Sequence, residues 1–569
     1  MRMIGAKALI ECLKREHVEV VFGYPGGSVL TLYNELYKSN IPHVLTGHEQ
    51  GAVHAADGYA RATGRTGVCF ATSGPGVCNM VTGSATAYMD SIPLVVFSGQ
   101  VATNLIGRDS FQEADISGIT TPITKHNYLV KNVNDLPRVV REAFYIAGTG
   151  RPGPVLVDIA KDVFDRELEF EYPETVHLRG YNGNVKGREE DVVAAVEALR
   201  QAKKPLFLTG GGVLTSGTSA LVCDIVKKAG IPVVTTLMGK GCVPDTWNLH
   251  LGMAGMHGSY AANMAITDCD LLVAVGARFD DRVTGDVENF APNARIVHFD
   301  IDKVEINKIV QADISVNGDL RWSMPLFADR VLSLADDWDG RFASWRNDVL
   351  AHKAAHPFAS QPMGRAVTPQ LLFEAVQART DADTIAVTDV GQHQMWAAQF
   401  YQVEKPRHFV TSGGLGTMGY GLPAAMGARL GRPQNTVVLF TGDGSILMNC
   451  QEFSTLHRYN VEVKVIVFHN KVLGMVNQWQ RLFYNGVQAA SVIPDFPDMD
   501  KVSAAMGVPG FRVTSRDDLE AGLDKLFRTP GPALLDVVIP EEEKVYPMVP
   551  GGKRLDEMIL GETEGGTAE

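Results

Sequence analysis

Long apolar runs are missing from this sequence, and so is any pattern of paired cysteines. No stretch approaches the roughly 18 apolar residues that a membrane-spanning helix requires, and the N-terminus begins with a helical pattern rather than a targeting segment. The seven cysteines are scattered among 569 residues without CxxC pairs. This spacing is typical of reduced, mostly buried thiols and indicates no cysteine metal site. We therefore expect a soluble, cytoplasmic protein without a membrane partner.

Positive charge is also in short supply. The chain has 52 Lys and Arg residues against 65 Asp and Glu residues, a formal net charge of −13, which argues against a nucleic-acid partner. If the substrates are anions, a few Arg or Lys residues must bind them locally. The remaining composition is that of an ordinary globular protein, and the length allows three or four domains that each bury a core.

Short apolar strands alternate with helical stretches through most of the chain. This alternation predicts an α/β protein of three successive doubly wound domains with mostly parallel sheets. We predict domains at 1–170, 190–345 and 366–550, polar linkers at about 166–190 and 340–365, and a flexible tail at 555–569. The predicted strands are 18–22, 67–71, 94–97 and 155–159 in the first domain, 205–209, 232–236, 271–275 and 296–299 in the second, and 384–388, 437–440, 463–468 and 533–538 in the third.

Two polar segments of the third domain follow neighbouring predicted strands. The turn Gly442-Asp443-Gly444 comes after one strand, and Asn470 comes after the next. Because the carboxyl ends of parallel strands meet at one edge of a sheet, we expect Asp443 and Asn470 to converge. Their oxygens suit Mg²⁺, and the glycines let backbone approach phosphate groups. A Gly-Asp-Gly tripeptide is also common in plain turns, so both interpretations stay open.

Similar glycine-rich segments follow other predicted strands. In the third domain, 389–393 follows a strand and 413–419 opens a helix, which together indicate a diphosphate site at the carboxyl edge of the sheet. In the first domain, 22–27 and 72–79 have the same strand-to-turn form. Each segment is also compatible with a tight structural turn.

Glu49 precedes a helix of small residues in the first domain. A glutamate at this position usually caps the helix or interacts with its dipole. If it is instead buried beside an aminopyrimidine ring, it can hydrogen-bond a ring nitrogen and favour the imino tautomer. The exocyclic nitrogen of that tautomer takes a proton from a thiazolium C2. The sequence around Glu49 leaves both roles open.

With these motifs in view, the chain resembles the catalytic subunit of acetohydroxyacid synthase, also called acetolactate synthase, a family of thiamin-diphosphate (ThDP) enzymes. The resemblance covers essentially all of the chain except the acidic tail. The general ThDP motifs fit many decarboxylases and carboligases, whereas 278–282 and 478–480 narrow the match to this family. The segments that carry the resemblance are 22–27, 48–50, 72–79, 111–113, 151–154, 276–282, 414–423, 442–470 and 474–479.

The resemblance implies an enzyme with three cofactors: ThDP, Mg²⁺ and FAD. Such an enzyme decarboxylates pyruvate on ThDP and condenses the hydroxyethyl carbanion or enamine with a second pyruvate or with 2-oxobutyrate. The products are 2-acetolactate and 2-aceto-2-hydroxybutyrate, at the first common step of branched-chain amino-acid biosynthesis. FAD has no redox role in the net reaction and binds the central domain.

The resemblance also implies catalytic and substrate-binding residues. Glu49 activates the aminopyrimidine, and Met418 forces the bent cofactor shape. Arg278 pairs with the acceptor carboxylate, and Trp479 forms a wall that favours an acceptor with an ethyl group. Gln112 and Lys161 complete the catalytic set, and the substrate-binding set is Gly27, Phe111, Gln112, Met256, His257, Arg278 and Trp479.

The cofactor ligands implied by the resemblance fall into three groups. Asp443, Asn470 and the backbone carbonyl of Val472 hold Mg²⁺. The ThDP group is Tyr24, Pro25, Gly26, Thr72, Pro75, Asn79, Val390, Gly391, Gln392, His393, Met418, Gly442, Gly444, Ser445, Gly474 and Met475, and the FAD group is Arg151, Gly210, Gly211, Gly212, Thr236, Leu237, Gly276, Ala277, Arg278, Arg282, Val283, Asp300 and Ile301.

By the same resemblance, the first domain of one chain and the third domain of another share each ThDP, in a homodimer or homotetramer. A small regulatory subunit is a further partner that the family allows. His469, Ala160 and Asn477 depart from the usual family pattern. The alternatives are another ThDP-dependent carboligase or decarboxylase, such as a catabolic FAD-independent acetolactate synthase, or a non-enzymatic relic of the fold.

Overall fold

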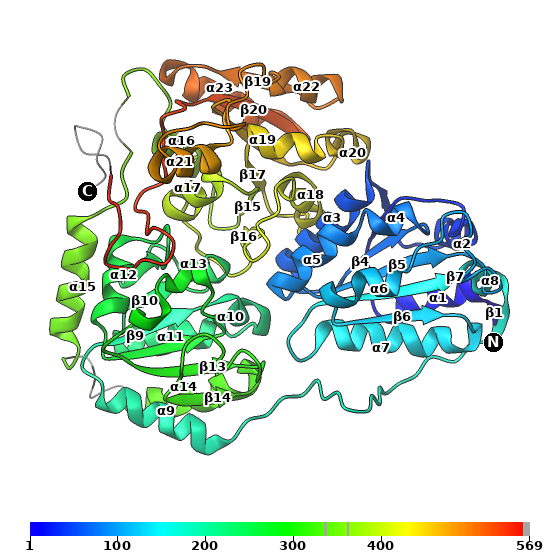
Figure 1. Ribbon diagram of the computed structural model, residues 1–569, viewed down its shortest axis with the longest axis horizontal. Coiled ribbons are helices and arrows are strands. Elements are labelled where there is room, and N and C mark those ends of the chain that lie inside the picture. Colours follow the sequence, from blue (N-terminus) through cyan, green and yellow to red (C-terminus); the bar gives the residue numbers. More distant parts are fainter. Residues whose placement is uncertain (335–337, 339, 361–362, 562–569) are drawn as a thin grey trace.

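The computed structural model describes all of the chain apart from residues 335–337, 339, 361–362 and 562–569. Three six-stranded sheets, each with all its strands parallel, are covered by helices (Figure 1). This arrangement confirms the predicted fold class of three successive doubly wound α/β units. Most of the tail that we expected to be flexible lies outside the described residues.

The N-terminal unit contains the first sheet. A two-stranded antiparallel ribbon ties the start of the chain, β1 (Arg2–Ile4), to β8 (Glu167–Glu169). In sheet order the strands are β3 (His43–Leu45), β2 (Val21–Gly23), β4 (Gly67–Ala71), β5 (Leu94–Gln100), β7 (Pro154–Ala160) and β6 (His126–Val130); the helices are α1 (Gly5–Arg15), α2 (Leu30–Lys38), α3 (Glu49–Thr63), α4 (Pro75–Cys78), α5 (Val81–Asp90), α6 (Ile116–Thr120), α7 (Leu136–Gly148) and α8 (Lys161–Asp165), with 3₁₀ turns at Thr121–Ile123 and Val133–Asp135.

The central unit contains the second sheet and follows a segment, 170–188, that crosses from one lobe of the molecule to the other (Figure 1). Its strands, in sheet order, are β11 (His250–Met253), β10 (Val233–Thr235), β9 (Pro205–Thr209), β12 (Leu271–Val275), β13 (Arg295–Asp300) and β14 (Ile314–Asn317); its helices are α9 (Glu189–Gln201), α10 (Gly211–Ser216), α11 (Ser219–Ala229), α12 (Tyr260–Asp268), α13 (Asp281–Thr284), α14 (Leu320–Leu334) and α15 (Ala343–Ala355), with 3₁₀ turns at Leu237–Gly239 and Val287–Asn289.

The C-terminal unit contains the third sheet and ends in an arm, residues 539–561, that returns to the central unit. There the N–H of Val549 donates to the carbonyl of Met256 at 2.8 Å. In sheet order the strands are β16 (Phe409–Val410), β15 (Ile385–Thr388), β17 (Val437–Gly442), β18 (Lys464–His469), β20 (Ala533–Val538) and β19 (Gly510–Val513); the helices are α16 (Pro369–Gln377), α17 (Gln392–Phe400), α18 (Gly421–Gly431), α19 (Asp443–Ile446), α20 (Glu452–Tyr459), α21 (Gly474–Phe483), α22 (Met499–Ala505) and α23 (Arg516–Arg528), with a 3₁₀ turn at Leu447–Asn449.

Helices α3 and α18 press against each other between the first and third sheets (Figure 1). A Cβ atom at Gly58 would lie 2.1 Å from the carbonyl oxygen of Ala424, and one at Gly427 would lie 1.8 Å from that of Ala55. Only glycine allows backbones to approach so closely. One continuous hydrophobic cluster therefore contains inner residues of both sheets, so the N-terminal and C-terminal units share a core.

The structure contains each of the twelve predicted strands, and they form the four inner strands of each sheet. Both edge strands of every sheet were missed: β3 and β6, β11 and β14, β16 and β19. The first predicted strand, 18–22, was placed too early, because pairing begins at Val21. The linker expected at 166–190 includes the ribbon strand β8 at its start and the first residues of α9 at its end.

Two expectations about the whole chain were tested by the structure. All seven cysteines are free, and most of them are buried, in agreement with the prediction of reduced thiols. In the part of the chain that the structure describes, no helix has the length and apolarity needed to cross a membrane.

Candidate active site

The carboxyl ends of β15, β17 and β18 meet at one edge of the third sheet. Pairing of Gly442 with Phe468 places Asp443 beside the segment that follows β18. The Asp443 carboxylate accepts hydrogen bonds from the N–H groups of Asn470 at 3.0 Å and Lys471 at 2.6 Å. Burial raises the pKa of this carboxyl, and the backbone donors oppose the rise. The structure therefore brings Asp443 and Asn470 together at the sheet edge.

The oxygen donors at this edge are of three kinds: the Asp443 carboxylate, the Asn470 side-chain amide and the backbone carbonyl of Val472. Within the described ranges there is no cluster of three His, Cys, Asp or Glu residues that could hold a metal ion. A set with one carboxylate suits a metal that completes its shell with phosphate oxygens and water. Mg²⁺ behaves in this way, so the donor chemistry fits Mg²⁺ bound together with a diphosphate.

His469, which departs from the family pattern, is directed at a neighbouring strand. Its Nδ1 lies 2.9 Å from Oδ1 of Asp536 on β20, and both side chains are buried. The ring also meets the ring of Phe496 edge-on at 5.4 Å. His469 therefore belongs to a buried pair beside the proposed metal ligands.

Glycines and a buried histidine shape the neighbouring strand ends. A Cβ at Gly391 or Gly442 would lie 2.8 or 2.7 Å from the ring of His393, so this ring fills the space between β15 and β17. Burial lowers the pKa of His393 to about 3, so its side chain is neutral at physiological pH. Helix α17 begins at Gln392, directly after Gly391, so the backbone N–H groups of its first turn lie at the sheet edge. Such N–H groups suit phosphate oxygens.

Gln392 is tied to the C-terminal arm rather than left free. Its Nε2 donates to Oε1 of Gln478 at 2.9 Å and to the carbonyl of Glu543 at 3.0 Å. Gln478 in turn exchanges two hydrogen bonds with the backbone of Val545. The arm therefore fixes helix α21, whose next residue is Trp479.

Glu49 is the first residue of α3 and is almost fully buried, with 9% of its surface exposed. Its Oε2 accepts a hydrogen bond from the side-chain amide of Asn79 at 3.0 Å. Its Oε1 lies 3.3 Å from the place that a Cβ at Gly76 would take, and that Cβ would also press on Thr72 at 2.7 Å. The glycine therefore keeps one carboxylate oxygen of Glu49 approachable.

The remaining predicted residues of the N-terminal unit surround this carboxylate or the same sheet edge. A Cβ at Gly26 would meet Thr72 at 2.5 Å, whereas one at Gly27 would meet nothing within 4 Å. Lys161 starts α8 at the end of β7 and is exposed. The structure thus places Tyr24–Gly27, Glu49, Thr72 and Asn79 close together, in a cluster separate from the one around Asp443.

The loop at 101–115 carries Phe111 and Gln112 beside the cluster around Glu49. Phe111 is 88% exposed, an unusual position for a phenylalanine. Gln112 has a positive φ of 59°, and its carbonyl would clash at 2.6 Å with any Cβ at Gly74. Gln100 supports the loop from below, because its Nε2 donates both to the Ala114 carbonyl and to the Asp158 carboxylate.

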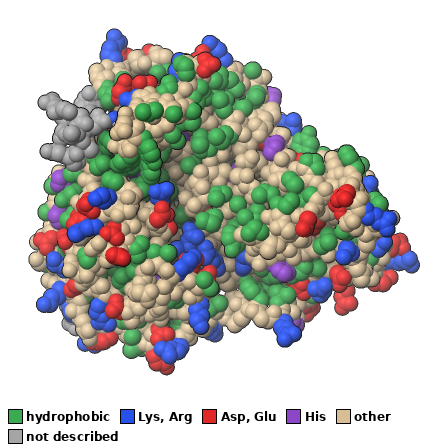
Figure 2. Space-filling model, viewed as in Figure 1, with side chains coloured by type: hydrophobic (Ala, Val, Ile, Leu, Met, Phe, Trp, Pro, Cys, Tyr) green, Lys and Arg blue, Asp and Glu red, His purple; other side chains and the backbone are tan. Residues whose placement is uncertain are grey.

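A cavity of about 980 Å³ opens between the central unit and the C-terminal unit and reaches the N-terminal unit around Arg61, Asp90 and Arg151. Figure 2 shows a hollow on this face of the molecule with Lys and Arg side chains beside it. Of the predicted residues, the lining contains Arg151, Gly211, Gly212, Thr236, Leu237, Met256, His257, Gly276, Ala277, Arg278, Arg282, Val283, Asp300, Ile301, Val390, Gly391, Met418, Met475 and Trp479.

The predicted acceptor pocket lies in this cavity. The guanidinium of Arg282 sits 5.8 Å from the ring centre of Trp479, within cation–π range, and its Nη1 is 3.5 Å from the sulfur of Met256. His257 is buried, and burial lowers its pKa to about 4. Arg278 lines the same cavity, so an anion entering it meets two guanidinium groups beside an aromatic wall.

The glycine-rich end of the cavity belongs to the central unit. A Cβ at Gly210 would lie 2.2 Å from the carbonyl oxygen of Gly276, so this glycine serves chain packing rather than the cavity wall. Arg151 bridges two units by ion pairs with Asp302 at 3.1 Å and Glu305 at 2.7 Å. Glycine turns and a long cavity at the carboxyl ends of β9, β12 and β13 fit a dinucleotide such as FAD.

The predicted residues thus form two separate groups in one chain. Apart from Arg151, those of the N-terminal unit, including Glu49, Asn79 and Gln112, do not line the cavity that contains Met418 and Arg278. Sequence reasoning also missed Asp158, Arg61 and Asp90. Asp158 interrupts an apolar strand, and Arg61 stands four residues after Asp57 in a helix of small residues, so each of these two residues had a local signal in the sequence. No local pattern marks Asp90.

Comparisons with known proteins match all three units of the chain to one family. Residues 3–119 match the family model of the thiamine pyrophosphate enzyme N-terminal TPP binding domain, 192–326 that of the central domain, and 389–537 that of the C-terminal TPP binding domain. The chain is 44% identical to the acetolactate synthase isozyme 3 large subunit of Escherichia coli, over 98% of this chain and 99% of that protein. It is 45% identical to the chloroplastic acetolactate synthase 1 of Nicotiana tabacum, over 99% of this chain and 85% of that protein, and 45% identical to the probable acetolactate synthase large subunit of Methanocaldococcus jannaschii, over 98% and 95%.

Proposed function

We propose a detailed function from the premise that this chain belongs to the acetolactate synthase family of thiamin-diphosphate enzymes. It is a transferase that joins two 2-oxo acids with loss of carbon dioxide. Two pyruvates give 2-acetolactate, and pyruvate with 2-oxobutyrate gives 2-aceto-2-hydroxybutyrate, precursors of the branched-chain amino acids. The observation that carries the finer proposals is the cavity that joins Arg278 and Trp479 to Met418.

Asp443, Asn470 and the Val472 carbonyl would hold Mg²⁺ and, through it, a diphosphate group. The glycines at 391 and 442 and the first turn of α17 would receive the phosphate oxygens by backbone contact. When bound, ThDP supplies the electron sink on which a 2-oxo acid loses carbon dioxide and becomes able to attack a second 2-oxo acid. Met418 and Met475, both on the cavity wall, would pack against its rings.

Glu49 would bind the aminopyrimidine end of ThDP and exchange a proton with its ring nitrogen. A carboxylate that is almost buried, with Asn79 on one oxygen and an open approach to the other, suits this role. Thr72 and Pro75 shape the same pocket from the strand β4 and the helix α4.

The acceptor would bind with its carboxylate on Arg278 and its alkyl group against Trp479. A guanidinium offers paired donors to a carboxylate, and the indole offers an apolar surface for one further methylene. Gln112, Lys161 and Phe111 would close this site from the loop and helix at the edge of the first sheet. Water exclusion by these side chains would keep the reacting carbon from being protonated before it meets the acceptor.

The central unit would bind FAD along the glycine-rich end of the cavity. Arg151, Thr236 and Asp300 would contact it, together with the glycines at 211, 212 and 276 that line the cavity or its turns. Because the net reaction transfers no electrons to a flavin, FAD would have a structural role here.

Each active site would combine two chains. Glu49 and the cavity with Met418 belong to separate groups in one chain, and the 88% exposed Phe111 is a side chain that a second copy would cover. A homodimer is then the smallest active unit, and a homotetramer of such dimers would preserve the same sites. Several relatives are named large subunits, which supports a small regulatory subunit as a further partner.

The test is an assay of the purified protein with pyruvate, with and without 2-oxobutyrate, omitting ThDP, Mg²⁺ or FAD one at a time. We expect acetolactate only when ThDP and Mg²⁺ are present, and a flavin absorbance band in the purified protein. Acetaldehyde in place of acetolactate would indicate a simple decarboxylase. Full activity without any bound flavin would indicate the FAD-independent type.

A further inference from the structure

The loop that carries Met418 is anchored more firmly than its glycine content suggests. We call residues 411–420, between β16 and α18, the Met418 loop. From its own unit, Gln394 donates to the Thr411 hydroxyl at 2.7 Å and to the Ser412 carbonyl at 2.9 Å. The N–H of Gly419 donates to Asp389 at 2.9 Å.

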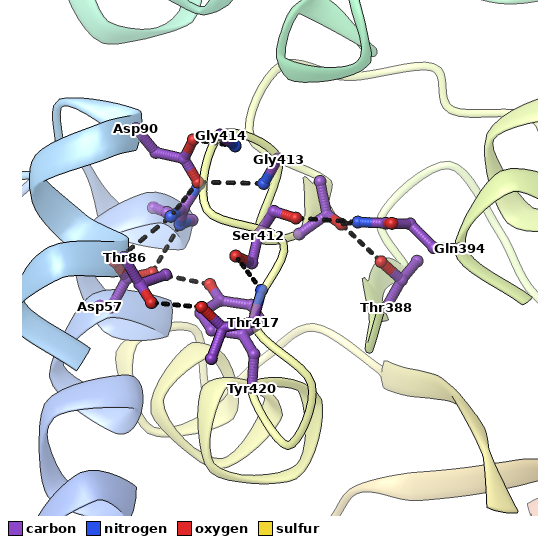
Figure 3. Close-up of polar contacts among 12 residues, drawn as sticks. Asp57, Thr86, Asp90, Thr388, Gln394, Ser412, Gly413, Gly414, Thr417 and Tyr420 are labelled. Atoms are coloured by element: carbon purple, nitrogen blue, oxygen red, sulfur yellow. Dashed lines mark hydrogen bonds and ion pairs between the residues drawn. The ribbon is translucent and has the colours of Figure 1, made fainter. Parts of the chain in front are cut away.

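The other anchors of the Met418 loop come from the N-terminal unit (Figure 3). Asp90, the last residue of α5, accepts hydrogen bonds from the N–H groups of Gly413 at 3.1 Å and Gly414 at 2.7 Å. One turn earlier in α5, the Thr86 hydroxyl lies 2.7 Å from the hydroxyl of Thr417, the residue before the methionine.

Arg61 of α3 connects these anchors into one buried network. Its Nη2 lies 2.8 Å from Asp90, and its Nε lies 2.5 Å from Asp57; the side chains of both acids are fully buried. Asp57 also accepts a hydrogen bond from the Tyr420 hydroxyl at 2.7 Å, at the other end of the Met418 loop. The loop is therefore held at both ends by carboxylates that share one guanidinium.

The network constrains the loop because the buried carboxylate of Asp90 needs hydrogen-bond donors. The Asp90 carboxylate has three donors: Arg61 and the N–H groups of Gly413 and Gly414. If the loop moved away, this buried carboxylate would lose two of its three donors, which is unfavourable. Glycine alone would leave the segment flexible, so Asp90 adds to the restraint that Gln394 and Asp389 give the loop.

We propose that Asp90 is a positioning residue for the acetolactate synthase reaction. Held by Arg61, it fixes the Met418 loop from the N-terminal unit of the same chain and so sets the wall of the cofactor site. This inference rests on the proposed function of Met418 in shaping bound ThDP.

The proposal gives helix α3 two tasks. Its first residue, Glu49, would act in a site completed by the other chain, whereas Asp57 and Arg61 hold the Met418 loop of their own chain. Asp57 follows Glu49 by eight residues, which is about 12 Å along the helix axis. One helix thus contributes to two active sites of the dimer.

The test is Asp90→Asn, which keeps the size of the side chain but removes its charge and one acceptor. We expect amide hydrogen exchange in 411–420 to rise about tenfold in protein without added cofactors. The Kd for ThDP, measured by fluorescence with Mg²⁺ present, should rise about tenfold, and kcat at saturating cofactor should fall about tenfold. The KM for pyruvate should stay within about twofold, because the acceptor pocket is unchanged.

Asp270→Asn is the matched control. Asp270 also accepts two consecutive backbone N–H groups, from Lys203 at 2.7 Å and Lys204 at 2.8 Å, but in the central unit. We expect this variant to leave exchange in 411–420 and the ThDP affinity at wild-type values. If D90N and D270N change loop exchange and cofactor affinity alike, the positioning role of Asp90 is overturned.

Thr86→Val tests the same proposal if D90N does not fold. It removes the partner of the Thr417 hydroxyl and, within α5, the hydrogen bond that the Thr86 hydroxyl donates to the Thr82 carbonyl at 2.9 Å. Faster exchange in 411–420 with about two- to fivefold weaker ThDP binding would support the proposal that α5 holds the Met418 loop, and wild-type values would overturn it. A wild-type protein that makes no acetolactate would refute the proposed function instead. The exchange measurements need no turnover, so they would still decide whether Asp90 and Thr86 hold the Met418 loop.

Discussion

At the scale of single residues, the proposed acceptor pocket has one indole in its wall, that of Trp479. Trp479 lies on α21, with Arg282 over its ring and Phe483 against its edge at 5.9 Å. Its Nε1 is buried without a hydrogen-bond partner among the described residues, so the ring presents an apolar face rather than a polar one. Such a wall prefers the acceptor that buries more apolar surface.

We predict that Trp479→Leu reduces the preference for 2-oxobutyrate over pyruvate as acceptor. Contact with one methylene is worth about 1 to 3 kcal/mol, so the preference should fall by about tenfold. The measurement is the ratio of the two products when both acceptors compete. Tyr484→Leu, at the exposed end of the same helix, is the control and should keep the wild-type ratio. An unchanged ratio in the Trp479 variant would remove this residue from acceptor selection.

Asp158 shows how a residue outside the reaction can report on pH. It is buried in β7 and accepts hydrogen bonds from Ser98 at 2.7 Å and Gln100 at 2.9 Å. Burial raises its pKa from 3.8 to about 7. The folded protein therefore binds this proton more tightly than the unfolded chain does, and its free energy of unfolding falls as pH rises between these two pKa values.

Asp158→Asn should remove this pH dependence, because the amide stays neutral. We expect the stability of the variant relative to wild type to increase by about 1 to 3 kcal/mol between pH 5 and pH 8. Urea unfolding at the two pH values measures the difference. A difference that is the same at both values would show that Asp158 is ionised throughout.

At the scale of elements, the sequence predicts the inside of each sheet and not its edges. Inner strands such as Leu271–Val275 are buried on both faces, so they form continuous apolar runs that stand out. Edge strands such as His126–Val130 and Gly510–Val513 are short and partly exposed, and their polar residues hide them among loops. Pairing with a neighbour, rather than local sequence, makes these segments strands.

The contact between α3 and α18 gives a prediction at this scale. Gly427→Ala adds a Cβ that would lie 1.8 Å from the carbonyl oxygen of Ala55. Alanine in a helix interior normally stabilises by about 0.5 to 1 kcal/mol, so the helix alone would gain. We expect instead a net loss of about 1 to 3 kcal/mol, because the backbones must separate. Chemical denaturation measures it, with Gly551→Ala, which meets nothing within 4 Å, as control.

At the scale of the whole molecule, sequence reasoning proposed the site residues, and the structure brings several of them together. The convergence of Asp443 and Asn470 follows from neighbouring parallel strands, and the structure shows the hydrogen bond between them. No local pattern links Glu49 to Asn79, or Asp90 to Gly413, because those contacts depend on how helices pack. The resemblance identified Glu49, whereas Asp90 became visible only through its contacts in three dimensions.

Sharing of each site by two chains can be tested with two inactive variants. Glu49→Gln should fold normally and lower the rate by orders of magnitude, because it removes the carboxylate that we propose activates the cofactor. Asp443→Asn should lose Mg²⁺-dependent cofactor binding. Coexpressed together, the two variants should recover about one quarter of wild-type activity, because half of the dimers are mixed and one of their two sites is intact. No recovery would show that both residues act within one chain.

The double task of helix α3 has a genetic consequence. A variant chain that distorts the middle of this helix would displace its own Met418 loop and, in the proposed dimer, would also misplace the Glu49 that completes the site of its partner. Both sites of a mixed dimer would then be damaged, although one of its chains is normal. Such alleles are expected to be dominant, whereas alleles that affect only the metal ligands would leave one working site in each mixed dimer and be recessive.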